Sequence, residues 1–288
     1  MAKKFRSKKA VEHGTNAAIY IILTIISVVW LFPFVYLVLQ SLRGESGIVG
    51  YFLPHEWTFD NYIKLFTDNS RFHFLKWYGT TLAISVAVTV IQTTIVLITS
   101  YALSRLRFKM RKPLMNLMLV LGMFPGFMSM TAVYFILKLI GLTQDMGLVG
   151  LILVYVASSC MGYYICKGFF DTIPKSLDEA ARIDGANRQT VFFKIILPLA
   201  KPIIIYTILT AFMAPWGEFM FASLIMNGNE QYFNVAVGLK EMLTRENIDK
   251  YFTQFCAASV VISIPITVLF FCLQRYYVQG VTGGSVKG

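Results

Sequence analysis

This sequence lacks the residue patterns that bind nucleotides or carry out covalent catalysis. Counted from Gly280, the ending GVTGGSVKG has Ser285 where a phosphate-binding loop needs its second glycine, and no Ser or Thr follows the lysine. The patterns H-E-x-x-H and G-x-S-x-G are also missing, and the three histidines are scattered. The chain is therefore not expected to be an enzyme, to bind ATP or to hold a metal ion.

Cysteine and charged residues are also scarce. Cys160, Cys166, Cys256 and Cys272 lie within or at the ends of apolar runs and show no C-x-x-C spacing, so we expect structural thiols. Charged residues make up 14% of the chain and hydrophobic residues 56%, which is too apolar for an ordinary soluble domain. These proportions indicate a membrane protein.

Six apolar runs are each long enough to cross about 30 Å of hydrocarbon. They cover about 17–42, 78–103, 113–137, 148–166, 202–226 and 252–276. The first run lacks an A-x-A cleavage site and reads as an uncleaved span. Pro125-Gly126 predicts a break within the third. The expected fold is an all-α integral membrane protein with six transmembrane helices.

The net charge of +11 follows the predicted topology. Segments 1–15, 104–112, 167–201 and the chain beyond 274 hold 18 of the 26 Lys and Arg residues. The positive-inside rule places these segments, and both termini, in the cytoplasm. Because the charge is explained by topology, nucleic acid is not an expected partner.

Four regions follow from these patterns. They are a basic cytoplasmic arm (1–15), a first transmembrane helix with an external segment (16–77), a core of five transmembrane helices (78–276) and a cytoplasmic tail (277–288). The core includes a polar cytoplasmic segment at 169–201.

Polar residues inside the spans are candidates for a transport path. Thr81, Ser85, Thr89 and Gln92 form a stripe at helical spacing, which either packs against other helices or lines a pore. Glu218 is the only acid within a span. An intramembrane carboxylate indicates a functional site, although near a helix end it can also reach water or a neighbouring hydrogen-bond donor.

The polar segment predicts two short helices joined by a turn. Ser176 and Glu179 have the form of a capping box for the first helix, and Gly185 stands where a left-handed residue ends it. Asn187 is placed to cap the second helix, which Pro198 and Pro202 are expected to close.

Such a pair of helices suits docking onto a soluble partner. An amphipathic loop on the membrane surface, anchored by Phe192 and Phe193, is an open alternative. A DNA-reading helix–turn–helix is disfavoured because both flanks run into apolar spans.

The pattern Glu179-Ala180-Ala181, three residues, Gly185, nine residues, Ile195, one residue, Leu197-Pro198 resembles the EAA loop of binding-protein-dependent ABC importer permeases. The stretches LPHEWTFDNYIKLF (53–66), WGEFMFA (216–222) and GVTGGSVKG are similar to maltose/maltodextrin-type, MalG-like permeases. The resemblance covers nearly all of the chain beyond the first ~15 residues, judged by these motifs.

This resemblance implies a type I ABC importer permease (MetI-like) fold in a bacterial plasma membrane. The implied partners are a homologous second permease (MalF-like), two cytosolic ATPases that bind ATP and Mg, an extracytoplasmic sugar-binding protein and an oligosaccharide. Maltodextrin is the first expectation, followed by galacto- or raffinose-type oligosaccharides. A secondary transporter and an ABC permease for a non-sugar solute are the alternatives.

The resemblance also assigns roles to individual residues. It implies ATPase docking by Ser176, Glu179, Ala180, Ala181, Arg182, Asp184, Gly185, Leu197 and Pro198, and ATPase contacts by Gly284 and Lys287 in the tail. Candidates for the translocation path are Gln92, Trp216, Glu218 and Phe219, and candidates for binding-protein contact are Asn227, Asn229 and Gln231.

Overall fold

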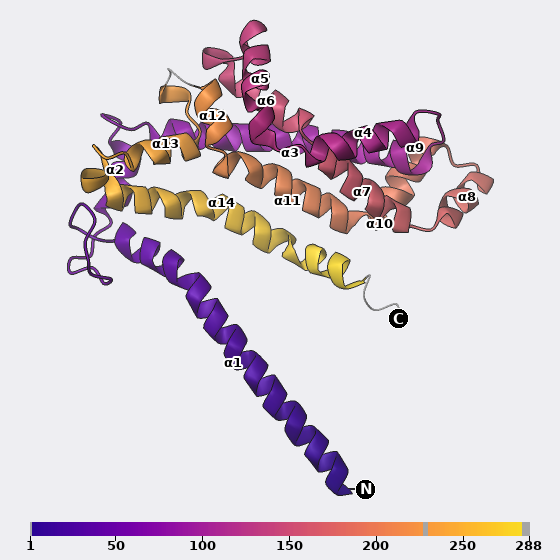
Figure 1. The fold of residues 1–288 in the computed structure, drawn as a ribbon, viewed down its shortest axis with the longest axis horizontal. Coiled ribbons are helices and arrows are strands. Elements are labelled where there is room, and N and C mark those ends of the chain that lie inside the picture. Colours follow the sequence, from indigo (N-terminus) through magenta and orange to yellow (C-terminus); the bar gives the residue numbers. More distant parts are fainter. Residues whose placement is uncertain (1, 227–229, 284–288) are drawn as a thin grey trace. The chain divides into compact units, whose positions relative to one another are not determined.

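The chain is helical, and it divides into two compact units (Figure 1). The computed structural model describes residues 2–226 and 230–283, with the side chains of 15–226, 230 and 232–275. Over these residues it contains no strand, only an isolated bridge between Arg43 and Trp57. Unit 1 comprises 1–67 and 242–261, and unit 2 comprises 68–241 and 262–288. The all-α prediction is confirmed, whereas the four regions expected along the chain stay a prediction.

The expected spans correspond to helices of sufficient length and apolarity. Four single helical stretches qualify: 15–41, 74–105, 144–172 and 248–275. Two bent pairs bring the number to six if each pair is one span, namely 111–123 with 126–139, bent by 101°, and 188–199 with 201–217, bent by 80°. The break predicted at Pro125-Gly126 is confirmed. The second bend was not predicted. It arises because the polar segment is helical up to Leu199, directly before the helix of the fifth span.

Unit 1 contains α1 (Ala2–Ser41), α2 (Asp60–Thr67) and the first part of α14 (Ile248–Gly283). The basic arm is continuous with the first span, since α1 begins at Ala2. The apolar stretch 15–41 has no residue of its most hydrophobic window buried within the chain. An apolar surface of this kind needs lipid or another apolar helix around it.

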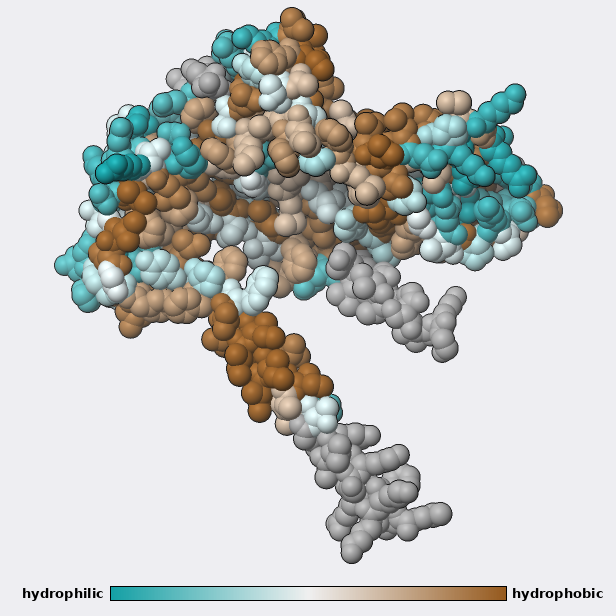
Figure 2. All heavy atoms as spheres, in the orientation of Figure 1, coloured by the Kyte–Doolittle hydropathy of each residue, from teal (hydrophilic) through white to brown (hydrophobic). Residues whose placement is uncertain are grey.

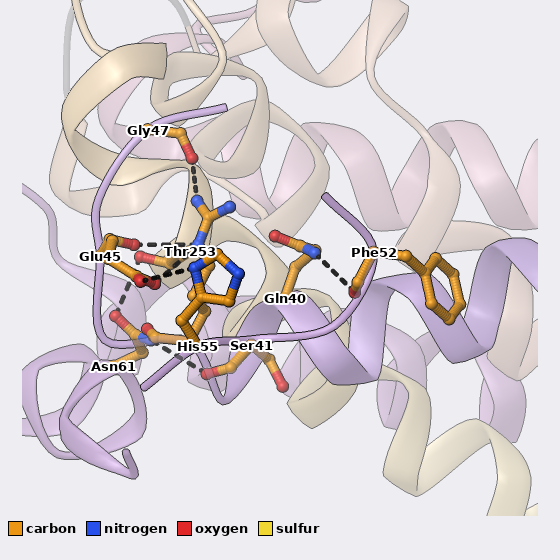
Figure 3. A network of polar contacts seen from close by, with 9 residues as sticks. Gln40, Ser41, Glu45, Gly47, Phe52, His55, Asn61 and Thr253 are labelled. Atoms are coloured by element: carbon orange, nitrogen blue, oxygen red, sulfur yellow. Dashed lines mark hydrogen bonds and ion pairs between the residues drawn. The ribbon is translucent and has the colours of Figure 1, made fainter. Parts of the chain in front are cut away.

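A buried arginine organises the segment that follows α1, and its partners Glu45 and Gly47 are labelled in Figure 3. Arg43 is fully buried, and its guanidinium donates hydrogen bonds to the carbonyl oxygens of Glu45 (3.0 Å) and Gly47. Partial burial and a hydrogen bond with Glu45 raise the pKa of Tyr51 above its ordinary value, so this hydroxyl stays protonated. The two hydrogen bonds from Arg43 therefore satisfy backbone carbonyl groups in a segment that has no regular structure.

Asn61 joins three parts of unit 1 (Figure 3). Its Nδ2 donates to the carbonyl oxygens of Ser41 (3.0 Å), the last residue of α1, and of Arg43 (2.7 Å), two residues beyond the helix. Its Oδ1 accepts from the hydroxyl of Thr253 in α14 at 3.0 Å. One buried amide therefore ties α2 to the end of α1 and to the start of α14.

Unit 2 is built around α3 (Phe74–Arg105), which packs against α6, α7 and α11. The other helices are α4 (Arg111–Met123), α5 (Gly126–Leu139), α6 (Gly147–Ala157), α7 (Cys160–Thr172), α8 (Lys175–Ile183), α9 (Arg188–Val191), α10 (Leu197–Leu199), α11 (Lys201–Gly217), α12 (Met220–Ile225) and α13 (Val235–Met242), with short turns η1 (Gln144–Met146), η2 (Phe192–Ile196) and η3 (Glu230–Tyr232). Within this unit, α8, α9 and α10 lie at one end, and α12 and α13 lie at the other (Figure 1).

Each end of unit 2 has its own apolar core. One core joins α3 and α7 to α8, α9, η2 and α11 through residues such as Tyr101 and Phe192, whose ring centroids are 4.7 Å apart. The other joins α3 to α5, α6, α11, α12 and α13. The functional features described below lie beside these two cores.

Residues 230–238, which follow the fifth expected span, pack against the first turns of α3. Gly238 of α13 lies so close to the Trp77 ring that no Cβ would fit, and the Trp77 indole donates to the Glu230 carbonyl at 2.7 Å. The Thr81 hydroxyl accepts from the Val235 amide at 2.8 Å. At Thr81, therefore, the polar stripe of α3 serves helix packing.

Candidate docking segment and membrane cavity

Helix α8 begins two residues earlier than a capping box would place it. Pro174, with φ −56° and ψ 130°, is its N-cap, and no side chain caps the helix. Proline has a fixed φ that suits this boundary and leaves Ser176 inside the first turn. The predicted capping box of Ser176 and Glu179 is therefore wrong.

The other end of α8 is closed as predicted. Gly185 has φ +83°, and its amide donates to the Arg182 carbonyl at 3.1 Å. The Ala186 amide donates to the Ala181 carbonyl at 2.9 Å. This pair of bonds is a Schellman motif, which requires a left-handed residue at this position.

The second helix of the segment is longer than expected. Asn187 caps it as predicted, since its Oδ1 accepts from the Thr190 amide at 2.8 Å. Pro198 does not close the helix, however, and the chain continues through α10 to Leu199 before it bends. The hydrogen bonds of the helix change to the π-helical pattern in η2, where the Leu197 amide donates to the Phe192 carbonyl. Such a bulge accommodates a proline that has no amide to donate.

Most of the predicted docking residues are exposed. Ser176, Glu179, Ala180, Arg182, Asp184, Gly185 and Pro198 are exposed, Leu197 is half-buried and Ala181 is buried. Ala181, 8% exposed, packs into the core of this chain and is not part of the exposed face of α8. Sequence reasoning missed Leu177 and Ile183, whose exposed fractions are 40% and 86%. Ile183 is the most exposed apolar side chain on α8.

A buried ion pair fastens α8 to the end of α3. Arg105 Nε lies 3.1 Å from Asp178 Oδ2, with the two side chains only 1% and 7% exposed. Arg105 Nη2 also donates to the Ile173 carbonyl at 2.8 Å. Asp178 and Ala181 are one helical turn apart and form the buried face of α8. The ion pair thus joins α8 to the end of a candidate membrane span.

A second polar tie lies beside the first. The Ser104 hydroxyl donates to Asp171 Oδ1 at 2.6 Å, and Lys167 Nζ is 2.5 Å from Asp171 Oδ2. Hydrophilic residues gather at this end of unit 2 (Figure 2). The polar segment 169–201, called the docking segment below, thus forms a polar end of an otherwise apolar helical unit.

A largely apolar cavity of about 480 Å³ lies beside the other core. Its walls come from α5, the end of α6 and the junction of α11 with α12, and α12 contacts both α5 and α6 (Figure 1). It is lined by Gly126, Phe127, Ser129, Met130, Val133, Val154, Tyr155, Ala157, Ser158, Glu218, Met220 and Phe221. All three walls adjoin helix breaks, at 124–125, 158–159 and 218–219. Interrupted membrane helices are typical of places where a solute path is lined.

Glu218 is the one predicted path residue that lines this cavity. Its Oε1 accepts from the Phe221 amide at 2.7 Å, so the carboxylate caps the start of α12. Asn234 donates to the Glu218 carbonyl at 2.7 Å and stabilises the break. Sequence reasoning missed Tyr155, whose hydroxyl is buried and has no hydrogen-bond partner among the described residues.

The other three predicted path residues lie elsewhere. Trp216 is buried, with its ring centroid 5.5 Å from that of Tyr78. The Phe219 ring faces Lys240, whose Nζ is 6.0 Å from the ring centroid. Gln92 is half-buried on α3 and does not line the cavity.

Several predicted contacts fall outside the described residues. These are Asn227, Asn229, Gly284 and Lys287. The backbone of Gln231 lies in η3, but its side chain is not described. Where side chains are described, no group of three or more His, Cys, Asp or Glu residues could hold a metal ion.

Comparison with known proteins adds a family to this geometry. Residues 94–283 match the family described as "Binding-protein-dependent transport system inner membrane component". The chain is 35% identical over 271 residues to the maltodextrin transport system permease protein MdxG of Bacillus subtilis, covering 93% of this chain and 95% of that protein. It is also 35% identical over 271 residues to the galactooligosaccharides transport system permease protein GanQ of the same organism, covering 93% and 94%.

Solved structures share the fold. A chain of a bacterial ABC transporter involved in the import of the acidic polysaccharide alginate superposes with a TM-score of 0.76 at 22% identity, covering 91% of this chain and 96% of that one. A second alginate transporter structure, in complex with a periplasmic protein bound to alginate pentasaccharide, gives a TM-score of 0.67 at 15% identity. At these identities the similarity concerns architecture.

Proposed function

Because this chain belongs to the family of binding-protein-dependent transport system inner membrane components, we propose that it is a permease subunit of an ABC importer for oligosaccharides. The observation that carries the proposal is the family match over 94–283, which includes both the docking segment and the cavity. The relatives named for maltodextrin and galactooligosaccharides support a sugar as the solute, with maltodextrin as the first candidate. A non-sugar solute is the alternative.

The proposed division of labour follows from what the chain carries. Separate cytosolic ATPases bind ATP and Mg and grip the exposed face of α8, including Glu179, Ala180 and Ile183. A second, homologous permease completes the path, and an extracytoplasmic binding protein delivers the sugar. Both termini face the cytoplasm in this arrangement. The tail residues Gly284 and Lys287 contact the ATPases, while Asn227, Asn229 and Gln231 reach the binding protein.

The cavity of α5, α6 and α12 is proposed as this subunit's share of the path. Aromatic faces and a few polar groups are suited to sugars, which present apolar ring faces and hydroxyl groups. Phe127 and Phe221 supply aromatic surface, while Tyr155, Ser158 and Glu218 supply polar atoms. A sugar hydroxyl would give the buried Tyr155 hydroxyl the partner that it lacks among the described residues.

The function is tested by reconstitution. Purified alone, the chain is expected to release no phosphate from ATP. Assembled with its partner permease and ATPases in vesicles, it should support ATP-dependent uptake of maltodextrin when sugar-loaded binding protein is added. ATP turnover by the chain alone, or uptake that follows an ion gradient without ATP, would refute the proposal. Uptake of only non-sugar solutes would retain the family role and overturn the sugar assignment.

Glu218→Gln separates sugar contact from helix capping. Glutamine keeps an oxygen for the Phe221 amide but removes the charge, and hydrogen bonds to a charged group contribute about 1.5–3 kcal/mol. We therefore expect the KM for uptake to rise roughly tenfold with little change in thermal stability. Glu218→Ala should also lower the melting temperature, because a lost cap costs about 1 kcal/mol.

The exposed acid Glu246 provides the matched control. Glu246→Gln removes the same charge away from the cavity and from the proposed binding-protein contacts, and should leave KM unchanged. If Glu218→Gln behaved like this control while Glu218→Ala was unstable, Glu218 would be a cap only.

A further inference from the structure

A second cavity of about 430 Å³ lies between the end of α3, the α3–α4 connection and the docking segment. It is lined by Ser104, Arg105, Leu106, Arg107, Arg111, Lys175, Asp178, Glu179, Arg182 and Arg188. Six of these side chains are cationic and two are acidic. The cavity is therefore strongly positive. The predicted topology explains the sign of this charge but not its concentration around one cavity.

Arg105 forms the buried part of this cavity and has donor groups that make no hydrogen bond. Its Nε lies 3.1 Å from Asp178 Oδ2 as an ion pair, and its Nη2 donates to the Ile173 carbonyl. Its Nε and Nη1 are both buried, and neither makes a hydrogen bond in the described part of the chain. Buried charged donors without an acceptor are costly, so a group that accepts from Nη1 would stabilise the site.

The cavity lies beside the connection between two candidate membrane spans. Residues 106–110 connect α3, which ends a candidate span, with α4, which begins another. Phe108 and Met110 in this connection are 41% and 57% exposed. Apolar side chains next to arginines at the end of a span are typical of the interface, where lipid phosphates lie.

We propose that this cavity binds the phosphate group of an anionic phospholipid. Five arginines line it, and guanidinium groups match phosphate oxygens with paired hydrogen bonds better than a lysine ammonium does. A volume of about 430 Å³ suits one headgroup but not a helix of a partner protein. Basic pockets between membrane helices are known lipid-headgroup sites. Because Lys175 and Arg182 belong to α8, the bound lipid would brace the helix that the proposed function assigns to ATPase docking.

The test compares two double variants of the assembled transporter. Arg107→Gln with Arg188→Gln removes two cations that line the cavity. Lys109→Gln with Lys112→Gln removes two nearby cations of the same chain that do not line the cavity. Each assembly is delipidated in detergent, and phosphatidylglycerol binding is titrated by native mass spectrometry, with phosphatidylcholine as the neutral probe. We expect the cavity variant to bind phosphatidylglycerol roughly tenfold more weakly than the lysine control.

A competition with inorganic phosphate identifies the source of the phosphate group. If phosphate displaces phosphatidylglycerol from the native assembly, both probes share the site and the proposed chemistry holds. Phosphate binding without any retention of phosphatidylglycerol would overturn the lipid assignment.

Two further results would overturn the proposal. Equal weakening in both variants would mean that only general surface charge attracts the lipid. Unchanged lipid binding with loss of the ATPases from the cavity variant would make the cavity a protein contact instead. A failure of sugar uptake in all assemblies would bear on the proposed function and not on this site, since lipid binding is read separately.

Discussion

Gly185→Val is expected to reduce sugar uptake to roughly a tenth of the native rate while the chain still inserts and assembles. Gly185 has φ +83°, and a Cβ at this position would meet no atom within 4 Å. The effect is therefore one of backbone strain alone. A left-handed conformation costs an ordinary residue about 1–2 kcal/mol, and a β-branched residue is more strongly opposed.

The strain acts on the end of the docking helix. To relieve it, the chain must give up the bonds from the Gly185 and Ala186 amides to the carbonyls of Arg182 and Ala181. The last turn of α8, which carries the exposed Ile183, then loses its fixed position against the ATPase. ATP hydrolysis by the assembly should continue, so the ratio of sugar transported to ATP hydrolysed is the quantity to measure.

Two controls isolate the left-handed backbone as the cause. Gly168 on α7 is also exposed, and a Cβ added there would meet no atom within 4 Å, but its φ is not positive, so Gly168→Val should transport normally. Gly185→Asn should retain most coupling, because asparagine tolerates the left-handed region. Full coupling in Gly185→Val would contradict the docking role of this segment.

The features that sequence predicted are those set by local chemistry. Apolar length located the spans, because a bilayer demands it regardless of tertiary structure. Pro125 broke its helix, Gly185 adopted positive φ, and Asn187 capped α9, each through a property of the residue itself. Glu218 could be singled out because an acid in an apolar span is rare.

Most of what sequence could not predict depends on contacts between distant segments. The start of α8 is a local exception: Ser176 had the right spacing for a cap, but Pro174 two residues earlier set the helix start. Trp216 lies two residues from Glu218, which lines the cavity, yet its ring packs against Tyr78. Tyr155 is one aromatic residue among many in an apolar run. Only the structure, in which three helix breaks adjoin one cavity, shows that Tyr155 lines it.

The Arg105–Asp178 pair is another such contact, and its loss should be severe. Asp178→Leu leaves the Arg105 guanidinium buried without its carboxylate, and breaking a buried ion pair costs about 3–5 kcal/mol. We expect a marked fall in the melting temperature of the purified chain in detergent. Asp184→Leu, on the same segment but at an exposed position, should have little effect.

Removing both charges together distinguishes stability from function. Because a buried pair can often be replaced by apolar residues at little cost, Arg105→Met with Asp178→Leu should recover most of the lost melting temperature. Apolar contacts lack the charge attraction between Arg105 and Asp178 and the hydrogen bond from Arg105 to the Ile173 carbonyl, just before α8. The double variant should therefore be stable but transport less sugar per ATP hydrolysed. A double variant that was stable and fully coupled would show that the ion pair only fills space. One that was as unstable as Asp178→Leu would show that the charges do not compensate each other.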